Sequence, residues 1–368
     1  MTATRHPRAD IYYWKCDRPA AFYGLHGRAA EHAPAEISTL LSVALAQHFG
    51  APVALAPGSG QGNHLTFTAR IGTQETFIRV EDGPDGDDYM AVEAHLLRAV
   101  ARLGVPAPAV LAVDASRRAV PFAWQVLARL PHADLNAHLK AGRLDLARLA
   151  PEIGAHIARW QEIAPSGFGP FSTALVGATG ELRGYHAGYA DYFHTRLDRH
   201  LAFLVEKNFL TRASAADLRR EIDTHAALLA LPAACLVHKD LALWNILGEP
   251  DRIAAYIDFD DAVGGDPLDD LSLLGCFHDG PTLGRVFDGY ARVRPLPADY
   301  RRRFWLHLLR NMIFKAVIRV GAGYFDRAGG FFLLGAGSSG ADLRAFTLTR
   351  LAAALHGLRS DADPASLS

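Results

Sequence analysis

Residues 238–245 read His-Lys-Asp-Leu-Ala-Leu-Trp-Asn, and residues 257–260 read Ile-Asp-Phe-Asp. Asp240 and Asn245 stand at the two ends of one short loop. A predicted β-hairpin over 245–257, turning at Glu249-Pro250-Asp251, returns Asp258 to the same place. Carboxylate and amide oxygens so arranged can hold Mg²⁺ against phosphates and orient an attacking hydroxyl. The pattern predicts phosphoryl transfer, with Asp240 as the catalytic residue and Asn245 and Asp258 as ligands of Mg²⁺.

The alternative for this stretch is a solvated loop that happens to be rich in aspartate. Asp258 argues against it, because this residue stands inside the apolar run Ala-Ala-Tyr-Ile-Asp-Phe. A buried carboxylate is costly unless a cation or a hydrogen-bond donor compensates its charge. The order and spacing of Asp240, Asn245 and Asp258 therefore favour a site.

These motifs resemble the aminoglycoside phosphotransferase family, which shares the protein-kinase-like fold and contains antibiotic kinases and kinases of small metabolites. The resemblance covers roughly residues 50–345 and is strongest over 236–271. It implies that Asp240 is the catalytic base and that His238 has a structural role. Gly265-Asp266-Pro267 is similar to the family's Gly-Asp-Pro, whose aspartate braces the catalytic loop, so Asp266 is also expected to be structural.

The elements expected around this core give an α+β chain with a protein-kinase-like bilobal fold. Apolar alternation predicts strands over 53–55, 64–71, 75–80, 109–113 and 122–129, and helical spacing predicts helices over 35–48 and 87–103. The predicted units are an N-terminal extension packed on the body (1–34), a β-rich N-lobe with a five-stranded antiparallel sheet and a helix (35–130), a helical C-lobe (131–358) and a loose tail (359–368).

Candidate nucleotide-binding residues lie in the predicted N-lobe. Gly60, Gln61, Gly62 and Asn63 are part of a glycine-rich turn that resembles the family's phosphate-approaching turn, and it is not a Walker A loop. Arg79 stands where such folds place a phosphate-contacting lysine, with Glu93 as its expected partner; the alternative is two exposed charges on separate elements. Gln125 and Leu127 are predicted in the hinge that meets the base. ATP and GTP are both compatible with these residues.

The candidate acceptor side comprises Lys239, Asp260, Lys315 and Arg319. Lys239 either lies near the transferring phosphate or the acceptor, or points into solvent. Lys315 and Arg319 either contact an acidic group of the acceptor or form a solvated helix edge. Between Leu271 and Ala345 eleven Arg or Lys residues stand against five Asp residues, which disfavours a polycationic acceptor. Aromatic residues are frequent there, and 331–340 is predicted to be a lid.

Composition excludes several other classes. The net charge of −1 gives no field to hold a nucleic acid or an anionic membrane. The three cysteines form no CxxC pair, and no apolar run reaches the length of a membrane span. We expect a cytoplasmic monomer or homodimer whose partners are a nucleoside triphosphate and a small-molecule acceptor.

Three functions remain compatible with these residues. The first is an antibiotic-inactivating O-phosphotransferase whose acceptor is nucleoside-type or glycosylated, and neutral or anionic. The second is a housekeeping kinase of a sugar, amino alcohol or amino acid, which would use the same apparatus. The third is a nucleotide-binding pseudokinase scaffold, which Asp240, Asn245 and Asp258 argue against because all three are present.

Overall fold

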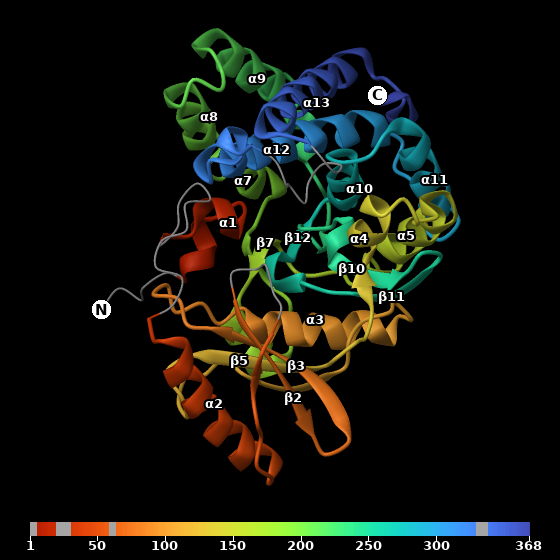
Figure 1. The fold of residues 1–368 in the computed structure, drawn as a ribbon. Coiled ribbons are helices and arrows are strands. Elements are labelled where there is room, and N and C mark those ends of the chain that lie inside the picture. Colours follow the sequence, from red (N-terminus) through yellow and green to blue (C-terminus); the bar gives the residue numbers. More distant parts are fainter. Residues whose placement is uncertain (1–5, 20–30, 59–63, 329–337) are drawn as a thin grey trace.

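The computed structural model describes residues 6–19, 31–58, 64–328 and 338–368. A small lobe built on a β-sheet and a larger, mainly helical lobe lie one on the other (Figure 1). This is the bilobal α+β fold that the sequence predicts. Gly60, Gln61, Gly62 and Asn63 and most of the predicted lid over 331–340 fall outside the described residues.

The small lobe contains a five-stranded antiparallel sheet in the order β1-β2-β3-β5-β4, as predicted. Its strands are β1 (Ala56–Pro57), β2 (Leu65–Ile71), β3 (Gln74–Glu81), β4 (Val110–Asp114) and β5 (Ala123–Ala128). Two helices accompany the sheet, α2 (Pro34–Phe49) and α3 (Met90–Arg102). Helix α2 begins at a proline, which has no amide hydrogen to leave unbonded, and is followed by Gly50 in the left-handed conformation.

Successive side chains of β3 point alternately toward α2 and toward α3. Ile78 and Val80 belong to the apolar cluster that also contains Leu41 and Leu45 of α2. Successive side chains of a strand point to opposite faces, so Arg79 points the other way, where it meets Glu93 of α3. The side chain of Arg79 therefore lies buried on the side of the sheet that faces the large lobe.

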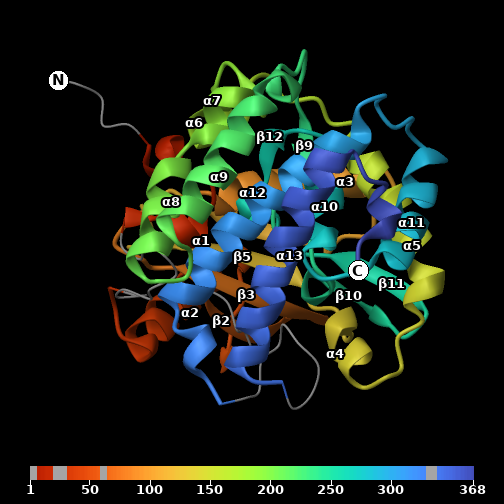
Figure 2. The ribbon, with the colours of Figure 1, turned by 90° about the horizontal axis from the view of Figure 1, so that it is seen from above.

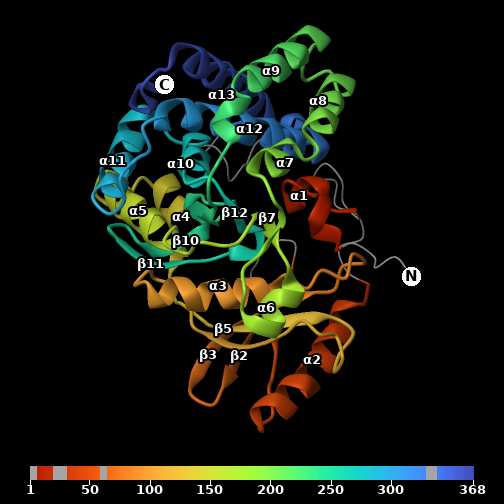
Figure 3. The same ribbon diagram turned by 180° about the vertical axis from the view of Figure 1, so that it is seen from behind.

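The large lobe combines helices with two small sheets, of order β11-β10-β6 and β8-β7-β12-β9. Its helices are α4 (Leu135–Lys140), α5 (Leu146–Trp160), α7 (Tyr189–His194), α8 (Leu197–Glu206), α9 (Arg212–Thr224), α10 (Leu268–Gly275), α11 (Gly280–Ala291), α12 (Tyr300–Gly321) and α13 (Gly340–Ser360). Its strands are β6 (Ala133–Asp134), β7 (Phe168–Phe171), β8 (Gly184–His186), β9 (Cys235–Val237), β10 (Ile246–Glu249), β11 (Arg252–Tyr256) and β12 (Val263–Gly265). Helix α12 is buried over most of its length, with α13 and α10 packed against it (Figure 2). Helix α6 (Thr173–Thr179) packs on α3 of the small lobe (Figure 3).

Residues 6–19, the N-terminal segment, pack against the body. This segment contains η1 (Pro7–Asp10) and α1 (Trp14–Asp17), and its aromatic residues Tyr12, Tyr13 and Trp14 are buried. Helix α1 packs on α12, at the level between the sheet and the helical lobe (Figures 1 and 3). Burial of these rings supplies the apolar contact that anchors the segment.

The C-terminal residues differ from the predicted loose tail. After α13, a 3₁₀ turn, η7 (Pro364–Ser366), packs on α11, and Leu367 is buried in the main apolar core. The Gly280 amide donates a hydrogen bond to the Leu367 carbonyl. Buried Leu367 and this hydrogen bond help to hold the end of the chain, as does Trp305 Nε1, which donates to the Ala362 carbonyl at 2.7 Å. Within the described residues, no helix is long and apolar enough to cross a membrane.

Candidate active site

The loop over 238–245 brings the predicted catalytic and metal-binding groups together. The Asn245 side-chain amide donates to the backbone carbonyl of Asp240 at 2.7 Å and lies 3.3 Å from its Oδ2. The hairpin β10–β11 then brings the Ile257 amide to the Asn245 carbonyl at 3.1 Å, so Asp258 follows directly beside the loop. Asp258 adopts a left-handed backbone with φ of 68°, a conformation that costs a non-glycine residue free energy. The three groups therefore share one neighbourhood.

His238 holds the loop to the hairpin, as its predicted structural role requires. Its Nε2 lies 2.9 Å from the Ile257 carbonyl, and the Asp240 amide donates to its Nδ1 at 3.3 Å. The carbonyl needs a donor and the amide needs an acceptor, so this pattern fixes the neutral tautomer with hydrogen on Nε2. The centre of the ring lies 4.3 Å from that of Phe259, which precedes Asp260, with the two planes tilted by 46°.

The brace beneath the loop is Asp270, and the role expected for Asp266 is corrected. Asp270 accepts hydrogen bonds from the amides of His238 at 2.9 Å and Lys239 at 3.1 Å. Asp266 is structural, but it binds Arg303 and His307 of α12. Asp270 follows Asp269 and stands before the apolar residue Leu271, and the sequence analysis did not single it out.

Lys239 occupies neither position expected for it. Its Nζ is fully buried, 2.7 Å from Asp269 Oδ2 and 2.9 Å from the Tyr12 hydroxyl. Burial alone would lower the pKa of this ammonium, but Asp269 and Tyr12 outweigh burial and raise it. Lys239, whose backbone is left-handed with φ of 70°, is thus an internal ion-pair partner of Asp269.

Arg79 joins the small lobe to the hairpin. Its Nη1 lies 2.6 Å from both carboxylate oxygens of Glu93, and its Nη2 lies 2.9 Å from Asp258 Oδ1. Both Arg79 and Glu93 are buried, so the alternative of exposed charges on separate elements is wrong. A guanidinium can make both contacts at once because its donors form a planar fork.

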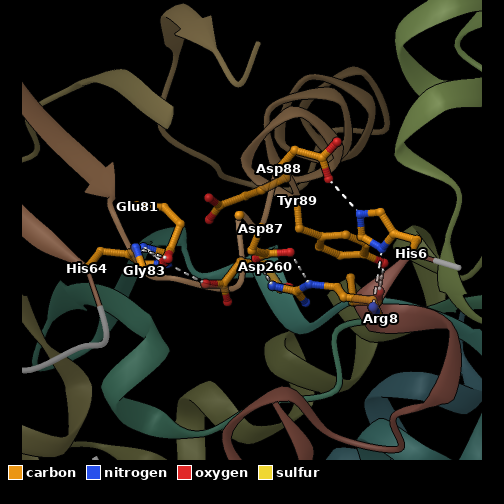
Figure 4. A network of polar contacts seen from close by, with 12 residues as sticks. His6, Arg8, His64, Glu81, Gly83, Asp87, Asp88, Tyr89 and Asp260 are labelled. Atoms are coloured by element: carbon orange, nitrogen blue, oxygen red, sulfur yellow. Dashed lines mark hydrogen bonds and ion pairs between the residues drawn. The ribbon is translucent and has the colours of Figure 1, made fainter. Parts of the chain in front are cut away.

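Asp260 contacts two small-lobe residues, Arg79 and His64. Its Oδ2 accepts from Arg79 Nη2 at 3.0 Å and lies 2.8 Å from His64 Nε2. His64, which the sequence analysis missed, also lies 3.1 Å from Glu81 through Nδ1 (Figure 4). Burial and the Arg79 charge lower the pKa of His64, but the two carboxylates outweigh them and raise it to about 9. A charged imidazole therefore stands directly after the glycine-rich turn.

The N-terminal segment covers Asp240. Lys15 Nζ lies 2.9 Å from Asp240 Oδ2, and the Tyr13 hydroxyl also hydrogen-bonds to this carboxylate. Arg8 fixes the segment to both lobes, through a bidentate pair with Asp87 before α3 and by donating to the carbonyl of Asp260 after β11 (Figure 4). Spacing along the chain gave no sign of these contacts, because Lys15 and Asp240 are 225 residues apart.

The electrostatics of the two aspartates differ. Burial would raise the pKa of Asp240, but Lys15 and Lys315 outweigh burial and lower it. Burial and the neighbouring Asp260 raise the pKa of Asp258, although Arg79 opposes them. Two carboxylates and an amide around a site that concentrates negative charge form a donor set suited to a hard divalent cation.

Lys315 and Arg319 do not form a solvated helix edge. Both are buried on α12, and Arg319 Nη1 donates to the Thr347 hydroxyl at 2.8 Å. Lys315 Nζ lies 4.8 Å from the centre of the Phe277 ring. Lys315 is close enough to act on Asp240, whereas Arg319 is held against α13.

Gln125 and Leu127 lie within β5 rather than in the connection after it. Gln125 is opposite Arg79 on one side and Val113 on the other, and Leu127 is opposite Phe77 and Val110. Backbone groups of a central strand are used by its neighbours. Both residues therefore belong to the sheet, and β5 ends at Ala128.

The small sheet, the buried Arg79–Glu93 pair and the Asp240–Asn245–Asp258 group define a kinase-type phosphotransferase. A family model described as the phosphotransferase enzyme family (APH) matches residues 54–305, and the chain belongs to this family. No curated protein matches the sequence.

Solved structures share the fold at low sequence identity. Aminoglycoside phosphotransferase APH(4)-Ia, in a ternary complex with ADP and hygromycin B, is 18% identical with a TM-score of 0.59, covering 86% of this chain and 98% of that one. Macrolide 2'-phosphotransferase MphH from Brachybacterium faecium is 18% identical with a TM-score of 0.53, covering 89% and 99%. A putative fructosamine-3-kinase from Haemophilus somnus 129PT is 15% identical with a TM-score of 0.54, covering 84% and 96%.

Proposed function

We propose that this chain transfers the γ-phosphoryl group of a Mg²⁺-bound nucleoside triphosphate to a hydroxyl of a small molecule that is neutral or anionic. The observation that carries the proposal is the convergence of Asp240, Asn245 and Asp258 at the end of one hairpin. Family membership supports phosphoryl transfer, and the neighbour solved with ADP supports a nucleotide co-substrate.

Asp240 orients the acceptor hydroxyl. Its lowered pKa keeps the carboxylate ionised, so it can accept a hydrogen bond from the attacking alcohol. The alcohol oxygen bonds to the γ-phosphorus while the bond from that phosphorus to the nucleoside diphosphate breaks, and the alcohol proton passes to Asp240. The Tyr13 hydroxyl already donates a hydrogen bond to this carboxylate. Lys15 and Tyr13 must leave Asp240, at least in part, before the acceptor can approach.

Asn245 and Asp258 would hold the metal ion. Mg²⁺ bound there supplies positive charge against the triphosphate oxygens. Arg79 Nη2 now contacts Asp258, so it can turn toward the phosphates while Nη1 remains fixed by Glu93. Glu93 is thus a positioning residue, since it acts on the nucleotide through Arg79.

The basic character of the acceptor side argues against a polycationic substrate. Lys15 and Lys315 both act on Asp240, and an aminoglycoside would bring further ammonium groups to the same place. The neighbours include an enzyme solved with hygromycin B, a macrolide phosphotransferase and a putative fructosamine kinase. Inactivation of a nucleoside-type or glycosylated antibiotic fits this site, and so does a housekeeping kinase of a sugar, amino alcohol or amino acid.

The test is a screen of hydroxyl-bearing antibiotics and metabolites with ATP or GTP, read as a mass gain of one phosphate. We expect at least one neutral or anionic compound to be phosphorylated, and we expect removal of Mg²⁺ with EDTA to abolish the reaction. Expression in a sensitive host then separates resistance from metabolism. Turnover that persists without a divalent ion, or only with polycations, would contradict the proposal.

A further inference from the structure

Lys315 is a buried cation that makes no direct ion pair in the described residues. It is only 8% exposed, and no carboxylate in the described residues forms an ion pair with it. The remaining residues, 1–5, 20–30, 59–63 and 329–337, contain no Asp or Glu, so their side chains cannot supply one. Burying an ammonium in this way costs several kcal/mol unless a partner is provided.

A second buried lysine in the same lobe, Lys239, is stabilised by a carboxylate. Lys239 Nζ lies 2.7 Å from Asp269 and 2.9 Å from the Tyr12 hydroxyl, and its pKa is raised although burial opposes this. Burial lowers the pKa of Lys315, and the nearby cations Arg319 and Lys15 lower it further. Cys276 and Asp240 raise the pKa, but only enough to offset part of this effect. The chain thus stabilises one buried ammonium internally and leaves the other without a fixed partner.

Aromatic rings place Lys315 beside the acceptor end of the site. Its Nζ lies 5.1 Å from the centre of the Phe314 ring, and Phe314 stacks at 4.5 Å on Tyr13, whose hydroxyl hydrogen-bonds to Asp240. On the other side, Phe277 lies 4.8 Å from Nζ and contacts Trp244 of the catalytic loop at 4.9 Å. The ammonium therefore lies in an aromatic enclosure that adjoins both Asp240 and the loop carrying Asn245.

Lys15 adds a second cation that can move. Its Nζ bonds Asp240 Oδ2 at 2.9 Å, but the side chain is 32% exposed and enters from the N-terminal segment. An acceptor hydroxyl that takes its place at Asp240 releases this ammonium. An anionic group on the same acceptor would then have two cations available, one fixed and one released.

We propose that Lys315, together with the displaced Lys15, binds an anionic group, a carboxylate or a phosphate, on the molecule whose hydroxyl Asp240 receives. This inference rests on the proposed function and narrows its acceptor class to hydroxyl compounds that carry an acid. The flanking rings of Tyr13, Phe277 and Trp244 cover the apolar part of such a molecule. Lys315 is a specificity-determining residue in this account, and Asp240 remains the group that handles the proton.

The first test needs no turnover and no known acceptor. The protein is saturated with Mg²⁺ and AMP-PNP, so that the nucleotide site is filled, and inorganic phosphate is titrated while the melting temperature is followed. We expect phosphate to raise Tm by about 2 °C in the unaltered protein and in Lys207→Met, an exposed control, and not in Lys315→Met. An equal rise in Lys315→Met, or no rise in the unaltered protein, would overturn the inference.

Folding of the variant is controlled within the same experiment. Lys315→Met removes an uncompensated buried charge, so its Tm without phosphate should equal or exceed that of the unaltered protein. Lys315→Arg keeps the charge and should recover part of the phosphate response. A Lys315→Met protein that melts much lower without ligand would show a structural role instead.

The second test compares hydroxy acids with their amides as acceptors. The unaltered protein should prefer the acid by about tenfold or more in kcat/KM, and Lys315→Met should remove this preference by raising KM for the acid alone. Equal use of acid and amide by the unaltered protein would contradict the anion subsite while leaving phosphoryl transfer intact. No phosphorylation of either kind would instead count against the proposed function, and the phosphate titration would still report on Lys315.

Discussion

At the scale of single residues, the choice of arginine at position 79 has a geometric reason. One nitrogen of the guanidinium binds both oxygens of Glu93, while another reaches Asp258 and Asp260. A lysine ammonium has one nitrogen and cannot span these partners with a fixed orientation. The guanidinium can therefore keep Nη1 bound to Glu93 while Nη2 turns from Asp258 to the phosphates.

Arg79→Lys should raise KM for the nucleotide about tenfold with a smaller effect on kcat, because a bidentate charged contact is replaced by a single one. The matched control is Arg70→Lys on the neighbouring strand β2, where the side chain is 69% exposed and pairs only with Glu75. Initial rates at varied nucleotide concentration give both constants. An unchanged nucleotide KM in Arg79→Lys would remove Arg79 from the nucleotide site.

Single residues also show how far the sequence could go. The spacing of Asp240, Asn245 and Asp258 predicted that these residues meet. The Arg79–Glu93 pair was expected from the resemblance to protein-kinase-like folds, and the two side chains do form an ion pair. Lys239 and Asp260 were assigned to the acceptor side, but their partners are residues distant from them in the sequence. Side-chain direction at such points depends on tertiary contacts and not on local pattern.

At the scale of elements, helix α10 and the turn before it support the catalytic loop. Asp270 binds the loop amides, Asp269 binds Lys239, and Asp266 joins the start of α10 to Arg303 and His307 of α12. The sequence analysis predicted a structural aspartate here, but it assigned the support of the catalytic loop to Asp266. The fold uses three acidic residues within five positions, each for a different neighbour.

Asp266 should make the protein sensitive to acid. Burial alone would raise the pKa of its carboxyl, but His307 and Arg303 lower it from 3.8 to about 2. The folded-state pKa is depressed, so the stabilisation is present above about pH 4 and is lost as the pH falls toward 2. The shift corresponds to about 2 kcal/mol for this fully buried group.

Urea unfolding between pH 2 and pH 6 measures this contribution. The free energy of unfolding of Asp266→Asn should be lower at pH 6 and should fall less steeply below pH 4 than that of the unaltered protein. Asp288→Asn, at an exposed position on α11, serves as the control. Parallel decline of Asp266→Asn and the unaltered protein would show that Asp266 does not report on acid unfolding.

At the scale of the whole molecule, the N-terminal segment links both lobes. Arg8 pairs with Asp87 next to α3, Asp17 binds His200 on α8, and Tyr12 stacks on Tyr192 of α7. The aromatic composition of residues 1–34 predicted packing, but the surfaces they cover could not be predicted, because contacts between residues far apart in sequence leave no local pattern. The buried tail at Leu367 was missed for the same reason.

Arg8→Met should destabilise the fold by about 3 kcal/mol, because it leaves Asp87 as an unpaired buried charge. Thermal unfolding should show a clear fall in Tm, and Arg143→Met, at an exposed position after α4, should melt like the unaltered protein. The double variant Arg8→Met with Asp87→Leu should recover part of the loss. If Arg8→Met left Tm unchanged, the segment would not be an integral part of the fold.

In this account Asp240 binds the acceptor hydroxyl and makes no contribution to nucleotide binding. The most direct measurement is kcat and the nucleotide Kd of Asp240→Asn, with an acceptor identified by the mass-gain screen. The control is Asp251→Asn, on the exposed β10–β11 turn. We predict that kcat falls by about 10² to 10⁴ in Asp240→Asn with the nucleotide Kd little changed, while Asp251→Asn behaves normally. Near-normal turnover by Asp240→Asn would contradict the account.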